Sequence, residues 1–368
     1  MKKSLFLKNT GLVFFVMNTT LALFMFSFIP LFLKEQGYTF WQLILLYVGY
    51  TALASLFVMV VSVFRIKQFI ATGFFLHCLA AFSFFWYSPA TIYVYLILLG
   101  LITLFYWVPL NYLFFEHSQR ETNATRSSWY YLVSGVISVV APLLGVIVIQ
   151  HLGYPWLFGL TAVLYVIPFL MAMKMIPEER KEAHFWQSFR SFKGLRTITF
   201  CEGALHFFGG VILPVYGLLF LHSESEVGKY LSYLGLLGVI IALFLSRKSD
   251  LSQKRKKYLY ALLLLMGISI ASFMVVETKF GWYVAVSFFT IISTISAPLR
   301  LAVSMDVKEV DLWFWKIREF SLNAGRATTL AIAAFFFYYG LYFPVFILFA
   351  LIAFSYPLLV GYKLKGVR

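Results

Sequence analysis

The chain has 368 residues, of which 61% are hydrophobic and only 12% are charged, and its mean hydropathy is +0.85. Soluble domains carry about 25% charged residues, so this composition excludes a soluble enzyme, a disordered chain and a disulfide scaffold. The 30 basic and 15 acidic residues give a net charge of +15, which in a membrane protein indicates basic loops on the cytoplasmic side.

Apolar runs long enough to cross a bilayer, about 20 residues each, recur along the whole chain. The first run follows Lys8 and is too long for a signal peptide, so it is interpreted as an uncleaved span. The sequence predicts an all-α polytopic membrane protein with twelve spans, at residues 10–33, 41–63, 69–87, 91–115, 128–151, 155–176, 197–221, 228–246, 258–276, 281–303, 319–339 and 343–362.

The longest polar stretch follows the sixth span and contains the sequence EERKEAHF. It divides the chain into an N-terminal six-helix half, a cytoplasmic linker and a C-terminal six-helix half, at residues 1–176, 177–196 and 197–368. Connections as short as Ser88–Pro89 force consecutive helices to be antiparallel.

The distribution of charge predicts the orientation of these spans. With both termini in the cytoplasm, 26 of the 30 basic residues fall on the cytoplasmic side and three on the outer side, while Arg326 lies inside the eleventh span. This predicts a multi-pass protein of the plasma or inner membrane with cytoplasmic N- and C-termini. The lipid bilayer therefore accounts for the basic surplus, and no nucleic-acid partner is expected.

Two cytoplasmic loops occupy corresponding places in the two halves. The loop after the second span reads SVFRIKQF, and the loop after the eighth reads SRKSDLSQKRKK, with Asp250 ahead of Lys254 and Arg255. Twelve spans divided in this way resemble the major facilitator superfamily of secondary transporters, whose loop signature is Gly-x-x-x-Asp-Arg-x-Gly-Arg-Lys. The resemblance implies that Asp250, Lys254 and Arg255 tie helix ends together; ordinary basic-loop charge is the alternative.

The fifth span contains Gly135, Pro142 and Gly145. This resembles the glycine-proline pattern of exporters in the same superfamily, although the pattern is incomplete here. Close helix packing around small residues and a proline kink is the alternative interpretation.

Polar groups inside the spans are candidates for mechanism, because a charged group in hydrocarbon needs a partner or a wet cavity. Glu202 is the only acid predicted to lie clearly within a span, and His206 follows it by one helical turn. A buried carboxylate beside an imidazole exchanges protons near neutral pH, so this pair is the expected proton-coupling site. Alternatively, Glu202 lies within about 10 Å of the cytoplasmic helix end and pairs with a loop cation.

Further polar residues belong to the expected gate and cavity. An acid followed by an arginine recurs where the fifth and eleventh spans begin, which is expected of two similar six-helix halves. Arg318, Asn323 and Arg326 are assigned to the gate. For Arg326, pairing with an acid such as Glu319 and contact with the substrate are the alternatives. In the superfamily, the first, fourth, seventh and tenth spans line the central cavity. The resemblance therefore implies a cavity that includes Asn18, Trp107, Asn111, Thr290 and Thr294.

The sequence contains no metal-ligand cluster, nucleotide-binding loop or catalytic motif, so no metal, cofactor or enzymatic activity is expected. The predicted function is secondary active transport by alternating access. Since the expected cavity has few fixed charges, the expected substrate is a small neutral or amphipathic cationic solute, and its transport is expected to be coupled to protons. Export is favoured over import, and the protein is expected to be a monomer. Two alternatives remain: a transport-inactive relative that serves as a partner or sensor, and a polytopic enzyme acting on lipid-linked substrates, against which the short outer loops argue.

Overall fold

The computed structural model describes residues 2–116, 123–245 and 255–363, and for residues 2–9, 124–125, 242–245 and 255–257 it describes the backbone only. The described chain is helical apart from two three-residue strands. Eleven of its helical segments are long and apolar enough to cross a membrane, which confirms an all-α polytopic membrane protein. The 22-residue helix α12 (Glu224–Leu245), where the eighth span is predicted, has three charged residues among its first six and is not among the eleven.

The segment before residue 177 contains six helical spans. They are α1 (Lys2–Met25) continued by the short helix Phe26–Phe28 and α2 (Ile29–Glu35), α3 (Phe40–Val60), α4 (Ile66–Phe85), α5 (Thr91–Ile102) continued by Thr103–Trp107 and α6 (Val108–Phe115), α7 (Asn123–Leu152) and α8 (Tyr154–Met175).

The segment after residue 194 contains α10 (Leu195–Phe207), continued by Phe208–Ile212 and α11 (Leu213–Gly217), and then α12. It continues with α13 (Arg255–Ser272) and the short helix Phe273–Val275, α14 (Lys279–Val307), α15 (Leu312–Tyr338) and α16 (Phe343–Lys363). Between the two segments lie β2 (Arg180–Glu182) and α9 (Phe185–Ser191).

Prolines explain why three spans are interrupted. Pro30, Pro109 and Pro214 each occupy the first or second position of α2, α6 and α11. Each proline lacks a backbone N–H and clashes with the preceding turn, so it removes a hydrogen bond from the regular ladder and disturbs the turn before it. The chain instead adopts a 3₁₀ turn before Pro30 and π-helical turns before Pro109 and Pro214.

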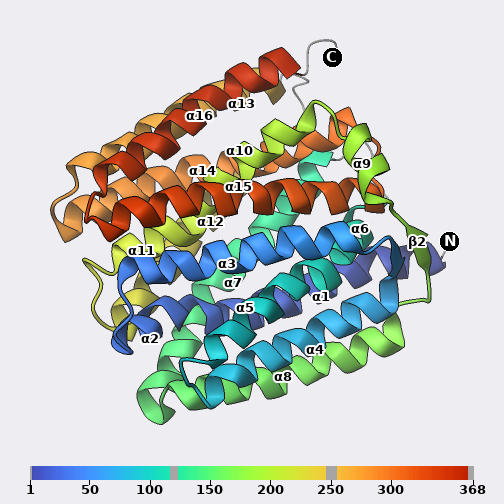
Figure 1. The fold of residues 1–368 in the computed structure, drawn as a ribbon, viewed down its shortest axis with the longest axis horizontal. Coiled ribbons are helices and arrows are strands. Elements are labelled where there is room, and N and C mark those ends of the chain that lie inside the picture. The colour runs from blue at the N-terminus through green and yellow to red at the C-terminus, as the bar shows by residue number, and fades with distance from the viewer. Residues whose placement is uncertain (1, 117–122, 246–254, 364–368) are drawn as a thin grey trace.

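The two segments meet mainly where α3 packs against α15 and where α7 packs against α12 (Figure 1). Glycines allow the second contact to be close, since a Cβ atom on Gly235 would lie 2.3 Å from the Ser138 hydroxyl. A Cβ atom on Gly228 would lie 2.3 Å from the Val146 side chain. Small residues are the usual means by which helices approach each other in lipid.

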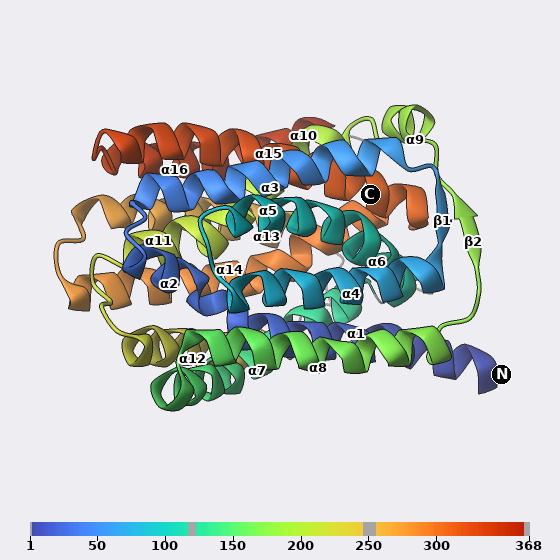
Figure 2. The same cartoon turned by 60° about the horizontal axis from the view of Figure 1, so that its bottom comes forward.

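A short antiparallel strand pair joins the loop after α3 to the chain between α8 and α9. In β1 (Val63–Arg65), Phe64 pairs with Lys181 of β2 and is fully buried. Figure 2 shows both strands at the end of the bundle where α1 begins, which we call the strand end. No strand is predicted here from the sequence, because three residues are too few to show the alternation of apolar and polar residues that indicates a strand.

The eleventh predicted span begins seven residues late. Helix α15 starts at Leu312, because the Asp311 carboxylate accepts a hydrogen bond from the Leu312 N–H at 2.7 Å and caps the helix. Lys316, Arg318 and Glu319 therefore lie within the helix rather than in or beside a loop. The consequence for the site is large, since all three side chains are buried.

Candidate functional site

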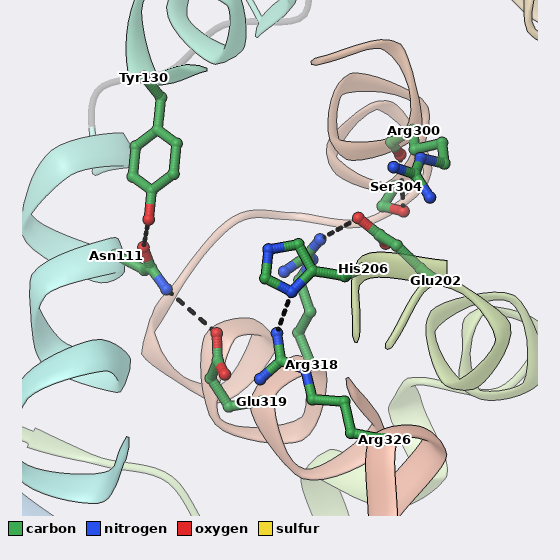
Figure 3. A network of polar contacts seen from close by, with 9 residues as sticks. All are labelled: Asn111, Tyr130, Glu202, His206, Arg300, Ser304, Arg318, Glu319 and Arg326. Carbon is green, nitrogen blue, oxygen red and sulfur yellow. Dashed lines mark hydrogen bonds and ion pairs between the residues drawn. The ribbon is translucent and has the colours of Figure 1, made fainter. Parts of the chain in front are cut away.

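The site is built around the contact between α10 and α15, which two glycines make unusually close. A Cβ atom on Gly203 would lie 2.1 Å from the Leu322 carbonyl oxygen, and one on Gly325 would lie 2.0 Å from the Phe200 carbonyl oxygen. No other residue type fits at either position without separating the helices. The close approach places polar side chains of α10 directly against α15 (Figure 3).

Glu202 and Arg318 form a buried ion pair across this contact. Arg318 Nη2 donates to Glu202 Oε1 at 2.6 Å, and the two side chains are only 7% and 5% exposed. Two atoms of the pair, Glu202 Oε2 and Arg318 Nε, are buried without a hydrogen-bond partner. Buried polar atoms normally have partners, so the pair retains unused hydrogen-bonding capacity.

His206 does not contact Glu202, although the two residues share a face of α10. Its Nδ1 lies 3.3 Å from Arg326 Nη2, and its side chain is exposed whereas Glu202 is buried. Arg326 Nη1 also donates to Asn323 Oδ1 at 3.0 Å. The structure therefore divides the predicted proton-coupling pair between two arginines, Arg318 for the carboxylate and Arg326 for the imidazole (Figure 3).

A second buried carboxylate connects the two segments of the chain. Asn111 Nδ2, on α6, donates to Glu319 Oε1, on α15, at 3.2 Å, and Tyr130 of α7 reaches Asn111 Oδ1 at 3.5 Å. Glu319 is only 6% exposed, so the expectation that Glu202 alone lies within a span is wrong. No ion pair of Glu319 with Arg326 occurs within 4.0 Å in the part of the chain that the structure describes.

Four polar side chains of α15 recur at helical spacing. Lys316, Glu319, Asn323 and Arg326 are separated by three, four and three residues, so they lie along one face of the helix. This spacing is the sequence signal that identifies Glu319 as part of the site. It is overlooked when residues before 319 are assigned to a loop.

Arg300, on α14, is a further buried cation near the pair (Figure 3). It is 3% exposed, and its Nε and Nη1 atoms have no hydrogen-bond partner. Arg300 is one of the 26 basic residues assigned to the cytoplasmic side, although it lies near the end of the predicted span 281–303. Helix α14 continues to Val307, two turns beyond Arg300, and the arginine side chain is buried.

The remaining predicted cavity residues lie in different surroundings. Asn18 is 1% exposed, and its Oδ1 accepts a hydrogen bond from Tyr165 at 3.3 Å, so it connects α1 to α8. Trp107, Thr290 and Thr294 are half-buried, and only Asn111 belongs to the network around α15.

The residues of the predicted loop contact lie at or beyond the limits of the described structure. Asp250 and Lys254 lie outside the described residues, and Arg255 begins α13 with its side chain undescribed. Among the described residues, no three His, Cys, Asp or Glu side chains form a group that would hold a metal ion.

Lys316 holds the strand end together. It is fully buried, and its Nζ donates to the Val61 carbonyl at the end of α3 and to the Ala183 carbonyl after β2, the latter at 2.7 Å. The rings of Phe64 and Phe185 lie 5.9 and 5.8 Å from the same Nζ. A cation at the C-terminal end of a helix is stabilised by the unpaired carbonyls there. One side chain thus links α15 to α3 and to the connecting chain.

Replacing Lys316 with methionine is expected to loosen the strand end, because two buried carbonyls lose a charged donor, worth about 1.5–3 kcal/mol each. Spin labels on the exposed Arg65 and Glu309 positions then report a longer and broader distance distribution. The exposed Lys174 of α8 provides the matched control, since its methionine variant leaves the distance unchanged. An unchanged distribution in Lys316→Met would contradict this role.

The comparisons with known proteins agree with this architecture. A sequence profile described as Major Facilitator Superfamily matches residues 10–310, which is most of the chain. The solved structure of the human organic anion transporter MFSD10 (TETRAN) is similar, with a TM-score of 0.71, 12% sequence identity, and coverage of 96% of this chain and 99% of that one. At this identity the likeness shows the fold. No curated protein matches the sequence. The chain is therefore a multi-pass membrane protein that belongs to the Major Facilitator Superfamily.

Proposed function

We propose that this protein is a secondary active transporter that moves an organic solute by alternating access. The observation that carries the proposal is the Asn111–Glu319 hydrogen bond, which places a buried carboxylate on the boundary between the two segments. In this proposal residues 1–176 and 197–368 are six-helix halves, 177–196 is the linker, and α12 is the eighth of twelve spans. The basic strand end and both termini face the cytoplasm.

Contacts between the halves at both ends of the bundle support a rocking mechanism. At the strand end, Lys316 binds the Val61 and Ala183 carbonyls. At the opposite end, Lys34 Nζ donates to the Leu218 carbonyl at 2.6 Å. Trp41 and Tyr338 pack edge to face there, with ring centroids 5.3 Å apart. Alternating access requires these two sets of contacts to break in turn.

We further propose that transport is coupled to protons through the buried carboxylates. Glu202 remains a candidate, but its proton uptake competes with the charge of Arg318. Glu319 accepts from a neutral amide of the other half, so protonation removes its charge and weakens the bond between the halves. His206, exposed beside Arg326, is placed to pass protons between the site and water.

The test is solute-driven proton flux in proteoliposomes that contain a pH-sensitive dye. A thermal-shift screen of purified protein first identifies a stabilising solute. Glu319→Gln and Glu202→Gln are each expected to bind that solute but to reduce coupled proton movement at least about tenfold. Glu182→Gln, which changes an exposed acid of β2, serves as the matched control. Wild-type coupling in both buried-site variants would exclude these carboxylates as proton carriers.

Direction, membrane and oligomeric state belong to the same proposal. We propose a monomer in the plasma or inner membrane. The glycines of α7 that resemble an exporter pattern make packing contacts, since a Cβ atom on Gly145 would lie 2.6 Å from the Phe24 carbonyl oxygen. These contacts favour the packing interpretation, so we do not base export on them. Flux measured with the pH gradient in either orientation establishes the direction.

A transport-inactive partner or sensor is the second candidate function. It rests on the first-half loop SVFRIKQF, which lacks the family signature and forms strand β1 instead. A solute that stabilises the protein but is not moved by it under any gradient would favour this alternative. Family membership and the transporter neighbour favour transport over enzymatic activity on lipid-linked substrates.

A further inference from the structure

The network around α10 and α15 has more positive than negative groups. It contains three guanidinium groups, on Arg300, Arg318 and Arg326, and two carboxylates, on Glu202 and Glu319. Arg318 is neutralised by Glu202 at 2.6 Å. In the part of the chain that the structure describes, Arg326 has no carboxylate partner within 4.0 Å. A cation inside a membrane-spanning helix is costly unless a counter-charge or water compensates it.

Uncharged groups hold the arginine side chain at hydrogen-bond distance, and the Glu319 carboxylate acts on it only over a longer range. Asn323 accepts from Nη1, His206 lies against Nη2, and Nε is buried without a partner. With its Nδ1 facing the guanidinium, a neutral imidazole carries its proton on Nε2, where it is a second donor. Since His206 is exposed, these donors border space that a ligand can enter.

An aromatic surface adjoins the same arginine. The Phe207 ring lies 4.5 Å from the Arg326 guanidinium carbon, and Tyr47 and Tyr50 of α3 lie against that ring at 6.3 and 6.1 Å between centroids. The two tyrosines also line a small apolar pocket together with Leu43, Leu46, Tyr95, Leu96 and Leu99. The cation is therefore next to an aromatic surface to which the other half contributes Tyr47 and Tyr50.

We propose that the substrate is an amphipathic organic anion. Arg326 binds its charged head group, with His206 as the second donor, and its apolar body lies against Phe207, Tyr47 and Tyr50. This inference rests on the proposed transport function and replaces the expectation of a neutral or cationic solute. That expectation followed from the few fixed charges expected in the cavity, whereas the structure places three arginines in the network.

The test compares two probes that differ in charge alone, 2-naphthoate and the neutral 2-naphthamide, with octanoate and octanamide as a second pair. Binding is measured by thermal shift and by calorimetry on purified wild-type protein in nanodiscs, with empty nanodiscs as the blank and no gradient present. The carboxylates are expected to bind at least about tenfold more tightly than the amides.

Variants assign that preference to one side chain. Arg326→Gln is expected to abolish it, Arg326→Lys to retain part of it, and His206→Gln to reduce it. Arg180→Gln removes an exposed arginine, 65% accessible on β2, and is expected to bind as wild type. If Arg326→Gln does not fold, the affinities for carboxylate and amide in the wild type and in Arg326→Lys still test whether Arg326 binds the anionic group.

Equal affinity for carboxylate and amide in both pairs, or no binding of any probe, would overturn the inference. A preference for carboxylates that persists in Arg326→Gln would overturn it as well. This test does not depend on transport. Carboxylate binding without flux would support the anion site and contradict the transport function. Proton-coupled flux of a neutral solute, without carboxylate binding, would support the transport function and contradict the anion site.

Discussion

Arg318→Met, with Glu202 left in place, is expected to lower the thermal stability of the purified protein strongly. Breaking a buried ion pair by removing one partner costs about 3–5 kcal/mol, because it leaves an uncompensated buried charge. Here the stranded group is the Glu202 carboxylate, 4% exposed between α10 and α15. The measurement is the melting temperature in detergent, together with the yield of monodisperse protein.

The double variant Glu202→Gln with Arg318→Met removes both charges and is expected to recover most of the loss. An exposed pair provides the matched control, because Arg180 and Glu182 lie 3.1 Å apart with side chains 65% and 54% exposed. Arg180→Met is therefore expected to cost less than about 1 kcal/mol. If the double variant is as unstable as Arg318→Met alone, the stranded charge is not the cause.

Gly203→Ala and Gly325→Ala are expected to separate α10 from α15. The added Cβ atoms would lie 2.1 and 2.0 Å from opposing carbonyl oxygens, which belong to backbone and cannot rotate away. Overpacking of this kind typically costs about 1–3 kcal/mol. Because the same approach brings Arg318 to Glu202, both variants are also expected to lose the coupling between these residues that a double-mutant cycle measures in the wild type.

Gly210→Ala, in the continuation of α10, provides the comparison. Its Cβ atom would lie 3.5 Å from the Phe207 ring, which is an ordinary contact, so we expect near wild-type stability. Thermal melting of the three alanine variants, with and without Arg318→Met, distinguishes the effects. Wild-type stability of Gly203→Ala would mean that the two helices are not held as closely as the structure has them.

The positions of most spans could be predicted from the sequence, because each is a long apolar run bounded by turns. Prediction was poorest where charge occurs within a helix. The segment WFWKIREF is typical of a basic loop. No local pattern indicates that Lys316 binds the carbonyl at the end of α3 or that Arg318 pairs with Glu202. Those partners lie far away in the chain and are decided by how the helices pack.

The sequence predicted which residues belong to the candidate site better than it predicted which of them contact one another. Glu202, His206 and Arg326 were identified because polar groups in hydrocarbon require an explanation. Their contacts could not be predicted, since three arginines, two carboxylates and one imidazole lie close enough for several pairings. The i, i+3, i+7 and i+10 spacing from Lys316 to Arg326 does carry the information that Glu319 shares their face.

The strand pair also sets a mechanical limit on how far the strand end can open. The chain is fastened to the first segment through Ala183, whose N–H donates to the Ser62 carbonyl at 2.8 Å. It is fastened to α15 by Phe185, whose ring packs against Phe320 at 5.0 Å between centroids. Only His184 lies between these anchors, and an extended residue spans at most about 3.6 Å. This short connection therefore limits how far α15 can move from the first segment. Wide opening at this end requires β2 to separate from β1 or α9 to separate from α15.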